Sequence, residues 1–200
     1  SALIGAFPYP SYTVVENQLE TGYAFPAFTL LGSSVIRLPF IQRSSLPHEV
    51  LHSWWGNSVE VDYERGNWCE GLTTYLADRA FQIEDGQGPT YRRKTLQGFQ
   101  DFVSAEHDFP VRRFVSKNDQ GSQAVGYGKV MMIFGMLENH LGSEVFFRAL
   151  SRFYRDYRFR MASFADLQGA FEQEAAHSLE AFFGPWLDQT GAPSVTLDDA

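Results

Sequence analysis

Short apolar runs broken by glycine and proline occupy the first forty residues of the chain. A short run rich in β-branched residues occupies 12–16 (YTVVE), and similar short runs follow at 27–31 and 34–37. Runs of this length and composition, bounded by turn-forming residues, are typical of β-strands. The pattern therefore predicts that residues 1–43 are rich in strands.

From about residue 44 the apolar positions recur at helical spacing instead. Ser44, Ser45 and Pro47 are residue types that favour a helix start, and they predict a helix over 47–55. A polar loop is expected at 60–67 and a second helix at 68–80. Further helices are predicted at 91–107, 124–141, 143–157, 164–174 and 179–189. Strands first and helices after them predict a single α+β unit.

Composition and charge narrow the functional classes. The chain has 200 residues, 44% of them hydrophobic and 20% charged, which is ordinary for a folded domain. Its formal net charge of −8 argues against nucleic acid as a partner. No apolar stretch approaches the roughly 18 residues that a membrane span requires. The single cysteine, Cys69, excludes an internal disulfide.

A metal-binding pattern lies in the first predicted helix, where residues 48–52 read HEVLH. Residues four apart share one face of a helix, so His48 and His52 can bind one ion. Glu49 is rotated from them by about 100°. Its carboxylate is therefore predicted to act as a base on a water molecule rather than as a ligand.

A third ligand is needed, because a catalytic zinc site uses three protein ligands and keeps its fourth position open. Glu70, eighteen residues after His52, lies in the second predicted helix and completes a His-His-Glu set for one Zn²⁺. Cobalt or manganese ions could occupy similar ligands. The alternative interpretation is a pair of core histidines and an unrelated surface glutamate.

Residues 48–57 (HEVLHSWWGN) and 68–75 (WCEGLTTY) together resemble the signature of the aminopeptidase N-like zinc metallopeptidases. These are gluzincins with a thermolysin-like catalytic domain. The resemblance implies one catalytic domain over 1–200, with a β-rich edge and substrate strand at 1–43 and a helical zinc-binding part at 44–200. It also implies that the chain is a fragment of a longer protein with additional domains. Seventeen residues separate His52 from Glu70, one fewer than is usual in the family.

The same resemblance assigns further roles in the helical part. Residues 126–129 (GYGK), followed by Met136-Leu137-Glu138, are similar to a family segment whose tyrosine supports the oxyanion, so Tyr127 is expected to do so here. Family members often carry an acid seven residues after the ligand glutamate. That position is Ala77, and Asp78 beside it would point about 100° away on a continuous helix.

The substrate strand departs from the family pattern. It corresponds to residues 22–26 (GYAFP), and Gly22, Tyr23, Ala24 and Phe25 are the expected substrate-binding residues. The glutamate that binds the substrate's α-amine in the family falls on Ala24 or Phe25.

Three interpretations of function stay open. The first is removal of N-terminal residues from peptides with a different amine anchor, for which Glu16 and Glu20 are nearby candidates. The second is a zinc endopeptidase without end recognition. The third is a non-catalytic peptide-binding homologue. A peptide is the expected partner in all three.

Overall fold

A three-stranded sheet forms the N-terminal part of the molecule. The computed structural model describes residues 3–20 and 22–192, so residues 1, 2, 21 and 193–200 of the predicted domain lie outside the described part. The strands are β1 (Thr13–Asn17), β2 (Gly22–Phe25) and β3 (Phe28–Gly32), in the order β1-β3-β2. β1 runs parallel to β3 and β2 antiparallel to it, so β2 is an edge strand of this sheet.

The predicted strands at 12–16 and 27–31 are confirmed to within one residue, whereas the strand predicted at 34–37 is wrong. The segment forms a short 3-10 helix, Val35–Arg37, in which the Leu38 N–H donates to the Val35 carbonyl. β1 and β2 already occupy both edges of β3. The segment after β3 therefore has no edge of that strand on which to pair.

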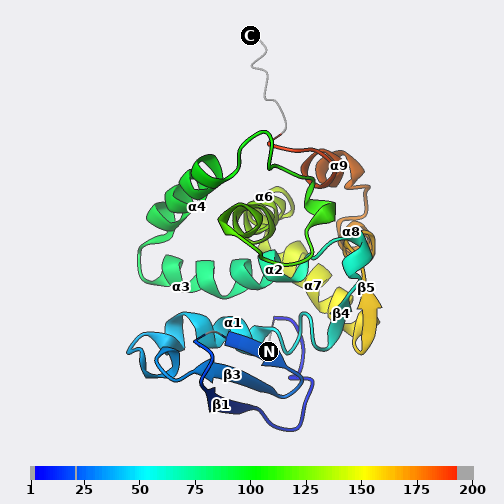
Figure 1. Ribbon diagram of the computed structural model, residues 1–200. Coiled ribbons are helices and arrows are strands. Elements are labelled where there is room, and N and C mark those ends of the chain that lie inside the picture. The colour runs from blue at the N-terminus through cyan, green and yellow to red at the C-terminus, as the bar shows by residue number, and fades with distance from the viewer. Residues whose placement is uncertain (1–2, 21, 193–200) are drawn as a thin grey trace.

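Helix α1 (Ser45–Leu51) follows a 3-10 turn at Ile41–Arg43 and carries the metal-binding pattern. It begins two residues earlier than predicted. Its regular part also ends earlier, although the Trp55 N–H still donates to the Leu51 carbonyl at 3.2 Å. α1 lies against β2 and β3. In Figure 1 this sheet and α1 form the lower part of the molecule.

A second, two-stranded sheet joins distant parts of the chain. β4 (Val59–Val61) pairs in parallel with β5 (Arg160–Ala162), and a 3-10 turn follows β4 at Tyr63–Arg65. The prediction of an unbroken loop at 60–67 is therefore wrong. Each strand has three residues and its partner lies about a hundred residues away, so no local pattern marks the pairing.

Helices make up most of the remaining chain, and Figure 1 shows them above the sheet with α6 near the centre. They are α2 (Cys69–Leu76), α3 (Asp78–Glu84), α4 (Gly88–Phe102), α5 (Gln120–Gln123), a π-helix at Ala124–Lys129, α6 (Val130–Leu141), α7 (Ser143–Tyr157), α8 (Phe164–Ala175) and α9 (Glu180–Asp188), with a 3-10 turn at Val111–Arg113 before α5. The α+β fold class is confirmed, and the extent of the single domain stays a prediction. No helix among the described residues is long and apolar enough to cross a membrane.

The helix predicted at 68–80 is in fact two helices. The chain breaks at Ala77, whose φ of −107° and ψ of −74° depart from helical values, and α3 starts anew at Asp78. The Ala77 N–H still donates to the Thr73 carbonyl. The break changes the direction of every side chain from Asp78 onward relative to α2.

An aromatic core fixes α1 relative to α2. Trp55, Trp68 and Phe153 are fully buried, with ring centroids 5.2–6.1 Å apart. The Trp68 Nε1–H donates to the Ala162 carbonyl at 2.8 Å, which ties the start of α2 to β5. Because Trp55 follows α1 and Trp68 precedes α2, their packing sets the distance between the two helices that carry the predicted ligands.

Candidate metal centre

The three predicted ligands converge on one point. Ligand atoms of His48, His52 and Glu70 all lie within 4.8 Å of one another. Glu70 Oε2 is 3.5 Å from His48 Nε2 and 3.4 Å from His52 Nε2. Two imidazole nitrogens and one carboxylate oxygen around a common point are a donor set that suits a single zinc ion. The structure thus brings together the three residues that the sequence pattern singled out.

Hydrogen bonds on the opposite ring nitrogens orient both imidazoles. His52 Nδ1 donates to the Trp55 carbonyl at 3.0 Å, and His48 Nδ1 donates to Asp78 Oδ2 at 2.8 Å. Each bond fixes the orientation of its ring, so that Nε2, the nitrogen that would bind a metal, is directed toward Glu70. Asp78 reaches His48 because the helix break at Ala77 removes the 100° offset expected on a continuous helix.

The electrostatics of the cluster reflect its burial and its opposite charges. Burial alone would lower the pKa of His48, but hydrogen bonds to Asp78 and Glu70 outweigh it and raise that pKa to about 9. Burial would likewise raise the pKa of Glu70, but hydrogen bonds from His48 and His52 hold it well below its usual range. Glu70 is therefore an anion, which is the form that binds a cation.

Glu49 lies beside the predicted ligands, and strand β2 at the edge of the sheet packs closely against its side chain. Burial raises the pKa of Glu49 above its usual value, although the two histidines pull it down. A Cβ added to Gly22 would lie only 2.5 Å from Glu49 Oε1. A side chain at this position would force the Glu49 carboxylate to shift, so glycine lets the β2 backbone lie close to the predicted base in its present position.

Tyr127 approaches the cluster from the π-helix before α6. Its ring lies nearly parallel to that of His48, with centroids 6.3 Å apart and planes 14° apart, and its other side meets Phe114. Burial and then the charge of Glu70 raise the pKa of the Tyr127 hydroxyl, so it stays protonated and able to donate. π-Turns within helices are frequent at functional sites, and the sequence pattern gave no sign of this one.

Cys69 lies in the same region but has a structural setting. Its side chain is buried, and its sulfur lies 3.3 Å from His52 Nδ1. Burial raises the pKa of the thiol, which disfavours the reactive thiolate. This environment does not favour a role for Cys69 as a nucleophile.

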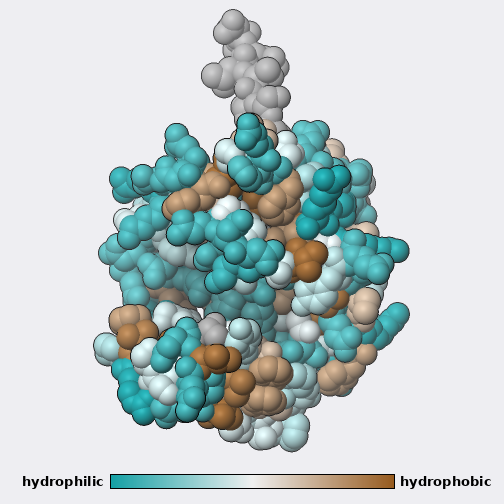
Figure 2. Space-filling model, viewed as in Figure 1, coloured by the Kyte–Doolittle hydropathy of each residue, from teal (hydrophilic) through white to brown (hydrophobic). Residues whose placement is uncertain are grey.

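A cavity of about 640 Å³ opens over the cluster, between the sheet and the helical part. The surface in Figure 2 is hollowed between these two parts. Gly22, Tyr23 and Ala24 of β2 line one wall, and Lys117 and Tyr127 line the other. Phe25, the fourth expected substrate-binding residue, lies outside this lining because its ring stacks on Phe28 with centroids 4.8 Å apart.

The two acids proposed as replacement amine anchors have different positions. Glu20 lines the cavity together with Glu49 and Glu70. Glu16 lies outside the lining, and Arg37 Nη1 is 2.6 Å from its carboxylate at the exposed surface.

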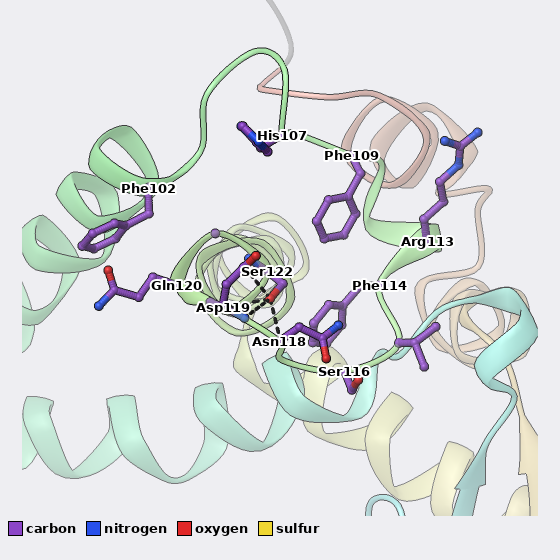
Figure 3. A pocket seen from close by; sticks show the side chains of 12 residues that line it. Phe102, His107, Phe109, Arg113, Phe114, Ser116, Asn118, Asp119, Gln120 and Ser122 are labelled. Carbon is purple, nitrogen blue, oxygen red and sulfur yellow. Dashed lines mark hydrogen bonds between the residues drawn. The ribbon is translucent and has the colours of Figure 1, made fainter.

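A larger cavity of about 890 Å³ lies elsewhere and contains none of the predicted site residues. It holds a serine, an aspartate and a histidine, shown in Figure 3, but they do not form a catalytic group. Ser122 Oγ donates to Asp119 Oδ1 and accepts from the Asn118 N–H, which closes the turn before α5. His107 Nδ1 instead lies 2.8 Å from Ser104 Oγ. Cavity size alone therefore does not mark the reaction site in this molecule.

Comparison with known proteins agrees with the geometry. Residues 43–186 match the peptidase family M1 domain. "Aminopeptidase 2, mitochondrial" of Saccharomyces cerevisiae is 27% identical over 179 residues, which is 85% of this chain and 19% of that protein. The alanine/arginine aminopeptidase of the same yeast is 25% identical over 211 residues, 96% of this chain and 25% of that protein. The chain thus spans about a fifth to a quarter of these relatives.

A solved structure shares the fold. The M1 zinc metallopeptidase of Deinococcus radiodurans superposes with a TM-score of 0.74 at 19% identity, covering 96% of this chain and 42% of that one. At this identity the likeness speaks for the fold alone.

Proposed function

The chain belongs to peptidase family M1, and on that premise we propose that it hydrolyses the first peptide bond of peptides with the help of one zinc ion. The observation that carries the proposal is the convergence of His48, His52 and Glu70 within 4.8 Å, in a cavity that Glu49 also lines. The aminopeptidase relatives favour N-terminal cleavage.

The residues of the cleft divide the chemistry between them. His48, His52 and Glu70 would hold the zinc, which supplies an activated water and polarises the scissile carbonyl. Glu49 takes the proton of the attacking water and passes it to the leaving amine. Its raised pKa brings it nearer to the working pH of such a base.

Tyr127 and β2 complete the proposed machinery. The protonated Tyr127 hydroxyl donates a hydrogen bond to the carbonyl oxygen as that oxygen gains negative charge, an interaction that strengthens toward the transition state. Gly22, Tyr23 and Ala24 lie on an edge strand that lines the cleft, so an extended peptide can pair with it. Such pairing positions the bond to be cleaved beside Glu49.

The proposal is tested by incubating zinc-loaded protein with a set of peptides of known sequence and identifying the products by mass spectrometry. Protein stripped of metal and then reloaded with zinc serves as a control for metal dependence. We expect loss of single residues from the N-terminus, abolished by stripping and restored by zinc. Internal cuts alone would replace the proposal with the endopeptidase alternative, and no cuts would favour the peptide-binding one.

A further inference from the structure

Among the described residues, three carboxylates line the proposed catalytic cleft, and one of these three has no role in metal binding or proton transfer. Glu70 is a metal ligand and Glu49 is the base in the proposed mechanism, which leaves Glu20. An enzyme that removes N-terminal residues has to recognise a protonated α-amine. Burying an ammonium group without an anion beside it is costly. We propose that the Glu20 carboxylate binds the α-ammonium group of the substrate, an inference that rests on the proposed function.

Glu20 and Gly22 line the cavity that also holds the proposed base, Glu49. Gly22, two residues further on, presses against Glu49, since an added Cβ there would lie 2.5 Å from Oε1. In a substrate the α-nitrogen lies only about 2.5 Å from the carbonyl carbon of the first peptide bond. An amine anchor therefore has to lie close to the base, and Glu20 lines the same cavity as Glu49.

The Glu20 carboxylate is held in place before any substrate arrives. The Ser34 N–H donates to Oε2 at 3.2 Å, and the Ser34 hydroxyl donates to the same oxygen. Gly32 makes room for this arrangement, because a Cβ there would lie 2.6 Å from Glu20 Cα and 2.8 Å from Oε2. A carboxylate has about four lone-pair sites. Two bonds from Ser34 therefore leave acceptor capacity for an ammonium group.

Among the described residues the Glu20 carboxylate forms no ion pair, although it interacts at longer range with the Arg37 guanidinium. Within residues 3–20 and 22–192, no lysine, arginine or histidine nitrogen forms an ion pair with Glu20, whereas Glu16 is paired with Arg37. Lys117, the lysine in the cavity lining, belongs to the opposite wall and lies over the Tyr127 ring at 5.8 Å. The ammonium group of a substrate is thus attracted by the Glu20 carboxylate on one wall of the cavity and repelled by Lys117 on the opposite wall.

A binding measurement isolates this contact from catalysis. The probes are phenylalaninol, which carries an ammonium group, and 3-phenylpropan-1-ol, which has the same skeleton without it; neither contains a peptide bond. Calorimetric titration of the zinc-loaded full chain should show that phenylalaninol binds at least about tenfold more tightly, as expected for a charged hydrogen bond. Glu20→Gln keeps an acceptor for Ser34 but removes the charge, and it should abolish the preference. Glu16→Gln, the matched control, should retain it.

Two results would overturn the inference: equal binding of both probes to the unmodified chain, or a preference that survives in Glu20→Gln. Kinetics give a second measurement, in which Glu20→Gln should raise KM about tenfold for free-amine peptides and leave kcat within about twofold. A protein that binds phenylalaninol through Glu20 but cleaves no peptide would refute the proposed function alone. Cleavage of free and N-acetylated peptides at equal rates would refute the amine site alone.

Discussion

Gly71 directly follows the proposed ligand Glu70, and the structure explains why a glycine is needed there. A Cβ at Gly71 would lie 2.2 Å from Val130 Cγ1 and 2.3 Å from Val130 Cβ. These separations are more than 1 Å short of the 3.4 Å at which ordinary van der Waals contact begins. Val130 is fully buried at the start of α6 and cannot move aside. Gly71→Ala should therefore push α2 away from α6 by about 1 Å.

The expected cost follows from two opposing terms. Overpacking a buried contact costs about 1–3 kcal/mol, and this clash with two atoms of a fixed residue belongs at the upper end. Replacing glycine by alanine inside a helix returns about 1 kcal/mol. The net loss of about 2 kcal/mol corresponds to a fall in Tm of about 4–8 °C for a domain of this size. Displacing Glu70 from the two histidines should also weaken zinc binding by at least about tenfold.

Thermal unfolding followed by circular dichroism, and zinc competition with a chromophoric chelator, measure the two effects. Gly169→Ala in α8 is the matched control, because a Cβ there meets nothing within 4 Å. That variant should keep its zinc affinity and gain up to about 1 kcal/mol. A Gly71→Ala protein as stable as the unmodified chain would refute the packing argument. A destabilised variant with unchanged zinc affinity would refute the link to the metal centre.

Three further predictions concern the cleft. Asp78→Asn should lower zinc affinity about 10–100-fold in the same competition assay, because it weakens the hydrogen bond that orients His48. Asp85→Asn, an exposed position on the same stretch of chain, is the control and should leave zinc affinity unchanged. Equal zinc affinities of the Asp78→Asn variant and the unmodified chain would show that Asp78 does not support His48. Tyr127→Phe should lower kcat about 100-fold or more in steady-state kinetics with KM and zinc content unchanged, and an unchanged kcat would remove Tyr127 from the mechanism. Removing zinc with a chelator should lower Tm, because a free zinc concentration of 100 times Kd adds about 2.7 kcal/mol to the free energy of unfolding when zinc binds only the folded protein. An unchanged Tm would argue against a zinc site that exists only in the folded protein.

The local patterns in the sequence were sufficient to predict which residues come together in the candidate metal centre. His48 and His52 share a helix face through their spacing, and α7 was predicted with the bounds that the structure shows, Ser143–Tyr157. Contacts between distant segments were not predictable in this way. No sequence pattern within β4 or β5 predicts that these two strands pair. Leu76-Ala77-Asp78 contains no glycine or proline that would predict a helix break.

The consequences of these missed features lie in the site itself. The break at Ala77 brings Asp78 to His48, a contact that a continuous helix would not allow. The placement of Glu20 likewise depends on a loop that Ser34 and Gly32 hold from a neighbouring segment. In both cases the residue was visible in the sequence, but its direction depended on tertiary contacts.

The most direct test of the central claim compares the chain with its Glu49→Gln variant on one free-amine peptide, after zinc content has been measured in both. Glu49 contributes no ligand atom to the His48, His52 and Glu70 cluster, so the variant should bind one zinc ion as the unmodified chain does. Without the base, kcat should fall by about 10²–10⁴-fold. Equal zinc content with that loss of turnover is the predicted result. Undiminished turnover in Glu49→Gln would contradict the proposed reaction at this site.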